Sequence, residues 1–298
     1  MKALLSVIIF FILNGCLSSF AQSKSGAPKF AHIIVVIEEN HSYSELIGSV
    51  NARYITRLSE NGALFTNSHG IGHPSQPNYL VLFSGSTQGV KDDNCAISQF
   101  TTPNLAAALI EKGFTFAGYA QTMPTVGYLG CAYIQSTLTV GYLYARKHCP
   151  WVNWQGTDAN QIPASVSLPM TSFPRDFNKL PTVSFVIPDM DRDMHNIGAP
   201  GDAAAIQRGD KWLKENLAPY AAWARAHNSL LIVTFDEDDY IPQNANRIPT
   251  IFYGAHVKTG KYDMAITHSN VLHTLENIYG LAVADTSAAK PITGVWKK

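Results

Sequence analysis

The sequence has no excess of charge of either sign, because 22 Lys and Arg residues balance 22 Asp and Glu residues. Net charge therefore attracts neither nucleic acid nor an anionic membrane, and an anionic substrate must be bound locally. Only 15% of the 298 residues are charged and 46% are hydrophobic, which excludes intrinsic disorder and is ample for a core. The chain also lacks internal repeats and low-complexity segments.

A run of apolar residues long enough to span a bilayer is missing near the N-terminus. The stretch from Leu4 to Leu13 is too short for a permanent anchor, which takes about 20 residues. It follows Lys2 and precedes a small-x-small site that ends at Ala21, so we predict a signal peptide over residues 1–21. Lipidation at Cys16 is an alternative that the asparagine two residues earlier disfavours. We expect a secreted or periplasmic protein without a stable transmembrane anchor.

Cysteine is scarce, and three residues remain after cleavage: Cys95, Cys131 and Cys149. Their spacing matches no zinc pattern, so we do not expect sulfur ligands for a metal. An odd number allows at most one disulfide in an oxidising compartment. We favour Cys95 with Cys131 and a buried thiol at Cys149.

Short apolar strands alternate with helical patterns along the chain. We predict strands at 32–37, 62–67, 114–119, 182–187, 230–235 and 248–253. We predict helices at 54–60, 77–84, 104–112, 203–227 and 270–279, with Pro219 breaking or kinking the fourth. The fold class is therefore α/β, with a mostly parallel central sheet flanked by helices on both faces. Residues 22–298 form one domain, with an irregular, lid-like insertion around 121–178.

Two of these strands stop at acidic clusters. Ile33 to Ile37 leads into Glu38-Glu39-Asn40-His41, and Leu230 to Phe235 leads into Asp236-Glu237-Asp238-Asp239. Such clusters present ligands at the carboxyl edge of an α/β sheet. Strand alternation points neighbouring side chains apart, so Glu38, Asp238 and Asp239 are expected in supporting roles.

A hydroxyl lies between the two clusters in His73-Pro74-Ser75-Gln76-Pro77-Asn78-Tyr79. Pro77 suits a first helical turn, which puts Ser75 at the start of a helix, where amides favour a phosphate or an alkoxide. Ser75 can equally be only an N-cap. Together with the acidic clusters it indicates a metal-assisted hydrolase.

An ordered set of motifs resembles the bacterial secreted acid phosphatase and phospholipase C phosphoesterase family of the alkaline phosphatase superfamily. The motifs are Glu-Glu-Asn-His (38–41), His-Pro-Ser-Gln-Pro-Asn-Tyr (73–79), Tyr-Ala-Arg-Lys-His (144–148), Asp-Met-His (193–195), Asp-Glu-Asp-Asp (236–239) and His-Ser-Asn (268–270). The resemblance runs from about residue 30 to Trp296 and is strongest to short, single-domain acid phosphatases, including those that act on phosphoinositides. Cys149 departs from it, since the family usually has Asn there.

The resemblance implies a role for each matching residue. It makes Glu39, Asn40, Asp236 and Glu237 the metal ligands, Ser75 the nucleophile that forms a phosphoserine, and Asn78 an amide that orients the phosphate. It places Asp193, His195 and His268 around the phosphate, where the superfamily often holds a second ion.

The chemistry of these residues agrees with the resemblance. Oxygen ligands suit one hard cation, Mg²⁺, Ca²⁺ or Mn²⁺, and a second ion is possible. With a pKa of about 6.5, His195 or His268 can protonate the leaving group, which predicts an acidic optimum. His73 contacts phosphate or serves the helix entry. Arg146, Lys147 and His148 form a basic cluster that binds the phosphate or headgroup of the substrate or belongs to a solvated surface.

We therefore expect an exported, metal-dependent acid phosphatase that hydrolyses phosphate monoesters through a phosphoserine. The alternatives are a phospholipase C-type phosphodiesterase and a catalytically silent metal-binding protein. The expected partner is a small phosphate ester or a phosphoinositide; no nucleic acid or obligate protein partner is evident.

Overall fold

The computed structural model describes residues 26–95, 99–282 and 288–297. The predicted signal peptide and Cys16 lie outside the described residues. Its strands are β1 (His32–Glu38), β2 (Ala63–Phe65), β3 (Ser68–His69), β4 (Phe116–Ala120), β5 (Ala132–Gln135), β6 (Tyr142–Ala145), β7 (Ser167–Pro169), β8 (Val183–Ile187), β9 (Ser229–Phe235), β10 (Thr250–Gly254), β11 (Gly260–Tyr262) and β12 (Ile266–Thr267).

Helices cover the sheet. The α-helices are α1 (Tyr43–Leu46), α2 (Arg53–Asn61), α3 (Ser75–Ser84), α4 (Leu105–Glu111), α5 (Asp202–Ala224) and α6 (His268–Tyr279). Short 3-10 helices are η1 (Arg146–His148), η2 (Pro150–Trp154), η3 (Ala164–Val166), η4 (Met170–Ser172), η5 (Phe177–Lys179) and η6 (Pro242–Asn244). Every helix and strand predicted from the sequence is confirmed to within a few residues.

The main sheet has eight strands in the order β11-β2-β10-β9-β1-β8-β4-β7. From β9 to β7 the neighbours are parallel, whereas β10 is antiparallel to both β9 and β2. The prediction of a mostly parallel sheet is confirmed. Because β1 lies beside β9 with Glu38 opposite Phe235, both acidic clusters leave the sheet at the same edge.

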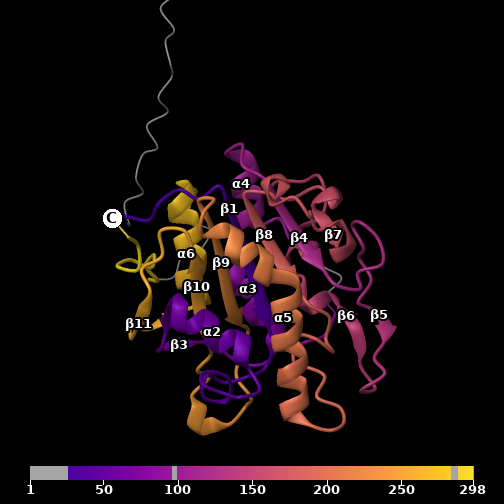
Figure 1. Ribbon diagram of the computed structural model, residues 1–298. Helices are drawn as coiled ribbons and strands as arrows, with labels where there is room; N and C mark the ends of the chain where they lie inside the picture. The colour runs from indigo at the N-terminus through magenta and orange to yellow at the C-terminus, as the bar shows by residue number, and fades with distance from the viewer. Residues whose placement is uncertain (1–25, 96–98, 283–287, 298) are drawn as a thin grey trace, which may run out of the picture.

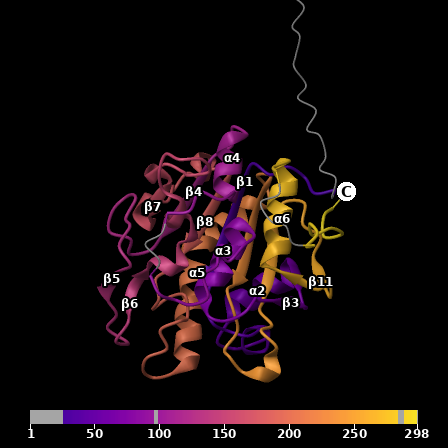
Figure 2. The same ribbon diagram turned by 180° about the vertical axis from the view of Figure 1, so that it is seen from behind.

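Both faces of the sheet are buried, as Figures 1 and 2 show from opposite sides. Along β1, Ile33, Val35 and Ile37 pack into a core with α3, α4 and α6. Ile34 and Val36 point the other way, into a core with α2 and α5. A run of β-branched residues is thus stable here because neither of its faces meets water.

Local sequence sets the ends of the helices that matter most for the site. All ten residues of α3 are buried, and the helix ends at Gly85, whose φ of 72° is the left-handed conformation that glycine adopts at low cost. A capping box between Thr267 and Asn270 starts α6. Of the two effects expected of Pro219, a break or a kink, the break is wrong, because α5 runs from Asp202 to Ala224 with Pro219 inside it.

The irregular stretch around 121–178 is more ordered than its sequence indicates. Strands β5 and β6 pair into a separate antiparallel hairpin, and β7 extends the main sheet beside β4. The disulfide between Cys95 and Cys131 is confirmed and joins this stretch to the loop after α3. Cys149 is a buried free thiol, as predicted.

Candidate active site

The acidic clusters meet where β1 and β9 end. The backbone N–H of Asp236 donates to the carbonyl of Glu38 at 3.1 Å, which continues the strand pairing past the sheet edge. Asn40 then turns the chain with a φ of 48°, and its N–H donates to Oδ1 of Asp236 at 3.2 Å. This turn sets Glu39, Asn40 and Asp236 side by side.

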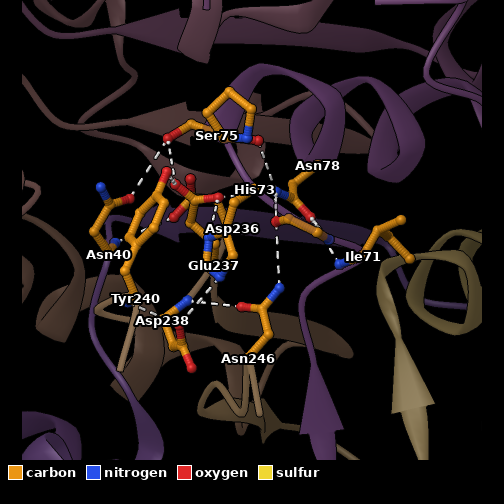
Figure 3. Close-up of polar contacts among 12 residues, drawn as sticks. Asn40, Ile71, His73, Ser75, Asn78, Asp236, Glu237, Asp238, Tyr240 and Asn246 are labelled. Carbon is orange, nitrogen blue, oxygen red and sulfur yellow. Dashed lines mark hydrogen bonds and ion pairs between the residues drawn. The ribbon is translucent and has the colours of Figure 1, made fainter. Parts of the chain in front are cut away.

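Ser75 lies among these acidic groups and is itself buried (Figure 3). Its hydroxyl Oγ is 3.2 Å from Oε2 of Glu39 and 3.2 Å from Oε1 of Glu237. Pro74 is the N-cap residue and Ser75 is the first residue of α3, with no side-chain hydrogen bond to cap the helix. The hydroxyl therefore faces carboxylates instead of serving only as a cap.

The carboxylates repel one another in the absence of a cation. Burial raises the pKa of Asp236 to about 7, with a further contribution from Glu237, and burial also raises the pKa of Glu237 to about 7. Burial, then Asp236 and Asp193, raise the pKa of Glu39 well above its usual value. One hydroxyl proton cannot satisfy this many acceptors.

The Asn40 amide gives a second sign of a cation. Its oxygen faces acceptors, and only an amide rotated by 180° would donate to Oδ1 of Asp236 at 3.3 Å and to Oε2 of Glu39 at 3.1 Å. A hard cation between these oxygens would remove the conflict without a rotation. The oxygen donors of the four predicted ligands, Glu39, Asn40, Asp236 and Glu237, suit such an ion. Among the described side chains, however, the ligand atoms of Glu39, His148 and Asp193 lie within 4.8 Å of one another, whereas those of Glu39, Asp236 and Glu237 do not.

The irregular stretch supplies the neighbouring wall of the site. Nε2 of His148 is 3.2 Å from Oε1 of Glu39, and Nδ1 is 3.5 Å from Oδ2 of Asp193. The three ligand atoms lie within 4.8 Å of one another, all are buried, and Asp193 Oδ2 has no hydrogen-bond partner. Tyr79 donates a short hydrogen bond to Oε1 of Glu39, and its ring stacks on His148. If a second ion binds, these residues are better placed than the set the sequence indicated.

Lys147, a member of the predicted basic cluster, lies at the site. Its Nζ lies 2.6 Å from Oδ2 of Asp93, whose Oδ1 accepts from the N–H of Gln76, the residue after Ser75. Burial lowers the pKa of Lys147, but the charges of Glu39 and Asp93 outweigh it and raise the pKa. The signal was present in the basic run that precedes Cys149.

His73 and Asn78 support the loop before Ser75. Nδ1 of His73 is 2.9 Å from Oε2 of Glu237, and its ring stacks on Tyr240 at 3.9 Å between centroids. The oxygen of Asn78 accepts from the N–H of Ile71 at 2.7 Å, and its NH₂ group donates to backbone carbonyls and, at 3.4 Å, to Oε2 of Glu237. Asn78 thus holds the loop that precedes Ser75, in addition to any contact with phosphate.

The two candidate general acids, His195 and His268, do not have the ordinary histidine pKa of about 6.5 on which the sequence-based prediction rested. Burial lowers the pKa of each to about 4, and Lys147 also lowers that of His195. Nε2 of His268 pairs with the carbonyl of Phe235 at 2.9 Å, whereas the His195 ring lies 5.9 Å from that of His148. The idea that ordinary histidine pKa values create an acidic optimum is therefore wrong for the free protein, where both rings stay neutral at mildly acidic pH.

The alternative interpretation of Arg146, Lys147 and His148 as a solvated surface is also wrong. Arg146 is buried, and its guanidinium donates to the carbonyl of Leu129 at 2.9 Å and to Oδ1 of Asn153 at 3.0 Å. His148 is buried against Glu39 as described, and the Lys147 side chain is only 15% exposed. These bonds let Arg146 hold the irregular stretch together, while Lys147 and His148 face the acidic cluster.

Comparisons with known proteins show the family and the fold of the chain. The model of the Phosphoesterase family matches residues 50–282. A phosphatidylinositol-3-phosphatase of Mycobacterium tuberculosis is 43% identical over 95% of this chain and 88% of its own. An acid phosphatase of Aspergillus fumigatus is 28% identical over 82% of this chain, which spans about half, 53%, of that protein. A Vibrio parahaemolyticus protein of the alkaline phosphatase superfamily shares the fold, with a TM-score of 0.61 at 13% identity over 91% of this chain and 72% of its own.

Proposed function

We propose, from the premise that this chain belongs to the phosphoesterase family, that it is a cation-dependent phosphomonoesterase working through a phosphoserine on Ser75. Family membership and the phosphatases among its relatives make it a hydrolase that acts on phosphate esters. The observation that carries the finer proposal is the buried Ser75 hydroxyl, 3.2 Å from each of two carboxylates at the start of a helix.

Glu39, Asn40, Asp236 and Glu237 would hold the cation, a hard ion of the Mg²⁺, Ca²⁺ or Mn²⁺ kind. Such an ion supplies charge neutralisation for the phosphoryl group and lowers the pKa of a nearby hydroxyl. Holding it would also explain why Glu39 and Glu237 both approach Ser75 Oγ, with Asp236 buried beside them. A further ion beside His148 and Asp193 stays a possibility of the same proposal.

The residues of the chain carry out the two steps. Ser75 Oγ forms a bond to phosphorus while the bond to the ester oxygen breaks, and that oxygen leaves with the electron pair and takes up a proton. The nearest acceptors for the serine proton are the carboxylates of Glu39 and Glu237. The leaving oxygen takes the proton that Ser75 gave up. Water then forms a bond to phosphorus while the bond to Ser75 Oγ breaks, so that the OH of the water leaves in inorganic phosphate and its other hydrogen becomes the proton of the Ser75 hydroxyl.

Two further groups stabilise the charge on the phosphoryl oxygens. The first N–H groups of α3 have no partner within the helix and favour an anion at its start. Lys147, held by Asp93 beside that start, adds a full positive charge. The names of the fungal relatives support an acidic optimum, and bound phosphate is the group that would raise the histidine pKa values toward it.

We further propose that the protein works outside the cytoplasm on phosphoinositides or small monoesters. The leader-like N-terminus and the Cys95–Cys131 disulfide support export. The mycobacterial relative, a phosphatidylinositol-3-phosphatase by name, supports a phosphoinositide substrate. Among the described residues, no helix is both long and apolar enough to cross a membrane.

The test is release of inorganic phosphate from an aryl phosphomonoester by wild type, Ser75→Ala and Ser84→Ala, each with and without a chelator. Ser84 lies in the same buried helix and is the matched control. We expect Ser75→Ala to lose about 10⁴-fold in rate and Ser84→Ala to keep most of it. When the substrate carries an isotopically labelled phosphate, labelled phosphoserine should be trapped on wild type and not on Ser75→Ala. Full activity of Ser75→Ala would refute the nucleophile, and an organic phosphate product from a diester would favour the phosphodiesterase.

A further inference from the structure

The exposed hydrophobic side chains of this protein are not spread evenly. Among the described residues twelve large hydrophobic side chains are exposed, and six of them fall between residues 126 and 142. These six are Val126, Leu129, Tyr133, Ile134, Val140 and Tyr142. Ile197, on the loop beside this segment, is a seventh. Clustered exposure of this kind marks an interaction surface, whereas single exposed residues do not.

Most of this surface belongs to the β5–β6 hairpin. The hairpin projects at the side of the molecule, away from α4 at the other end (Figures 1 and 2). Val140, next to its tip, is fully exposed, and Tyr133, Ile134 and Tyr142 are each more than two-fifths exposed. No residue from Gln121 to Ala145 is charged.

The hairpin is joined directly to the active site. Strand β6 runs into η1, which carries Lys147 and His148. The N–H of Met190 donates to the carbonyl of Leu143 at 2.9 Å, and Ser136 donates to Oδ1 of Asp191 at 2.6 Å. These bonds fix the hairpin to the loop that carries Asp193 and His195.

Positive charge lies beside the uncharged hairpin. A hollow of about 420 Å³ is lined by Thr137 and Leu138 of the hairpin loop and by three cations, Arg192, Arg208 and Lys211. Two of these cations are paired with carboxylates, Arg192 Nη1 with Oδ2 of Asp189 at 2.6 Å and Lys211 Nζ with Oε1 of Glu215 at 3.7 Å. Asp191 also lines the hollow. The Arg208 guanidinium is held by the backbone carbonyls of Asp191, Asn196 and Ile197, so its charge has no carboxylate partner there.

We propose that the β5–β6 hairpin is an interfacial anchor that inserts into a lipid bilayer and brings phosphorylated headgroups to Ser75. Aliphatic and tyrosine side chains suit the boundary between headgroups and acyl chains, and the neighbouring cations meet the anionic headgroup layer. The inference rests on the proposed phosphoinositide substrate, whose phosphate lies at a membrane surface.

A second copy of the chain fits this surface less well. A stable interface covers about 800 Å² on each partner. Two paired four-residue strands offer only roughly 13 Å by 10 Å on a face. A narrow, uncharged projection matches insertion between lipids better than docking on a protein face.

The experiment compares the wild-type chain with Ile134→Asp/Val140→Asp and with Ile110→Asp. Ile110 is an exposed apolar residue of α4, far from the hairpin, and serves as the matched control. Each protein is assayed on phosphatidylinositol 3-phosphate in phosphatidylcholine vesicles and on a soluble aryl phosphomonoester, and its co-sedimentation with the vesicles is measured. Melting temperatures check that all three are folded.

We expect the hairpin variant to lose about tenfold or more in vesicle turnover and in vesicle binding, with the soluble substrate unaffected. Ile110→Asp should match wild type in every assay. The proposal would be overturned if the hairpin variant bound and turned over vesicles as well as wild type does. It would also be overturned if wild type were a dimer, the hairpin variant were a monomer, and both still bound vesicles. If wild type cleaves neither substrate, the proposed function fails. Co-sedimentation with vesicles then tests by itself whether the hairpin binds lipid.

Discussion

The two walls of the site are built in different ways. Ser75, Glu39 and Asp236 stand on a buried helix and on the ends of two central parallel strands. Lys147 and His148 come from a 3-10 turn after an exposed hairpin, in a stretch without clear sequence periodicity. The first wall is rigid because regular elements of the core carry it. The second is an irregular segment that packs on the same core through Tyr144, Trp151 and Trp154 and is held further by polar bonds and one disulfide. We infer that the first sets the chemistry and the second sets what reaches it.

The largest effect is expected from removal of a charge from the first wall, at Asp236. Asp236→Asn should lower phosphomonoesterase activity about 10³-fold, because the cation loses a ligand beside Ser75. Asp239→Asn, the same exchange three residues on, should keep most of the activity, since Asp239 bonds only the nearby Asn244. Activity and cation affinity, measured together, check this; equal losses in both variants would contradict the assigned ligand set.

The second wall should depend on its covalent link. Replacing Cys95 and Cys131 by serine removes a cross-link over 36 residues and should lower the free energy of unfolding by about 2 to 4 kcal/mol. Cys149→Ala removes a buried thiol without a cross-link and should cost less, about 1 kcal/mol. Denaturant unfolding of the folded variants measures both. A larger cost for Cys149→Ala would show that packing, not the disulfide, holds this wall.

Lys147 tests whether the second wall takes part in the chemistry. Lys147→Met should lower kcat/KM by about 10- to 100-fold, because a charge beside the phosphoryl group is lost. Asp93→Asn should cause a smaller loss, since the lysine stays but is no longer held at 2.6 Å. Lys112→Met, an exposed lysine after α4, is the control. Steady-state kinetics that show equal values for all three would assign Lys147 a structural role only.

The smallest expected effect is a pH-dependent response to chelation. Asp236 and Glu237 have pKa values raised to about 7, so without cation the folded protein favours their protonated forms. The stability this contributes is complete below the unfolded pKa of about 4 and is lost as pH rises through about 7. A bound cation removes the repulsion, so a chelator should lower the melting temperature by a few °C more at about pH 8 than at about pH 5. A shift that is larger at the lower pH would contradict the assignment.

Sequence reasoning located the rigid wall well because its signals are local. A β-branched run that ends in carboxylates marks a strand end, and Pro77 one turn into a helix marks the helix start. The fold class and the main elements were predictable on such grounds, whereas the disulfide was a choice among the possible pairings of three cysteines. The meeting of Ser75 with Glu39 and Glu237 needed the register of β1 against β9, which no local pattern contains.

The second wall was harder to predict for physical reasons. Residues 121–178 are ordered by long-range contacts, such as Arg146 to Leu129 and Trp151 to Ser167, and not by periodic packing. The charge state of His195 and His268 depends on burial, which the sequence does not display. The sequence placed Lys147 in a basic cluster but did not indicate its partner, because only the fold brings Asp93 to it.

The buried Cys149 thiol has a practical consequence. Burial raises the pKa of this thiol far above its usual value, so it stays protonated and shielded from thiol reagents. The disulfide occupies the other two cysteines among the described residues. A single cysteine introduced at position 140 is therefore the reactive one in that part of the chain. A polarity-sensitive dye attached there would report the depth to which the hairpin enters a lipid surface, without any need to remove a native cysteine from the folded domain.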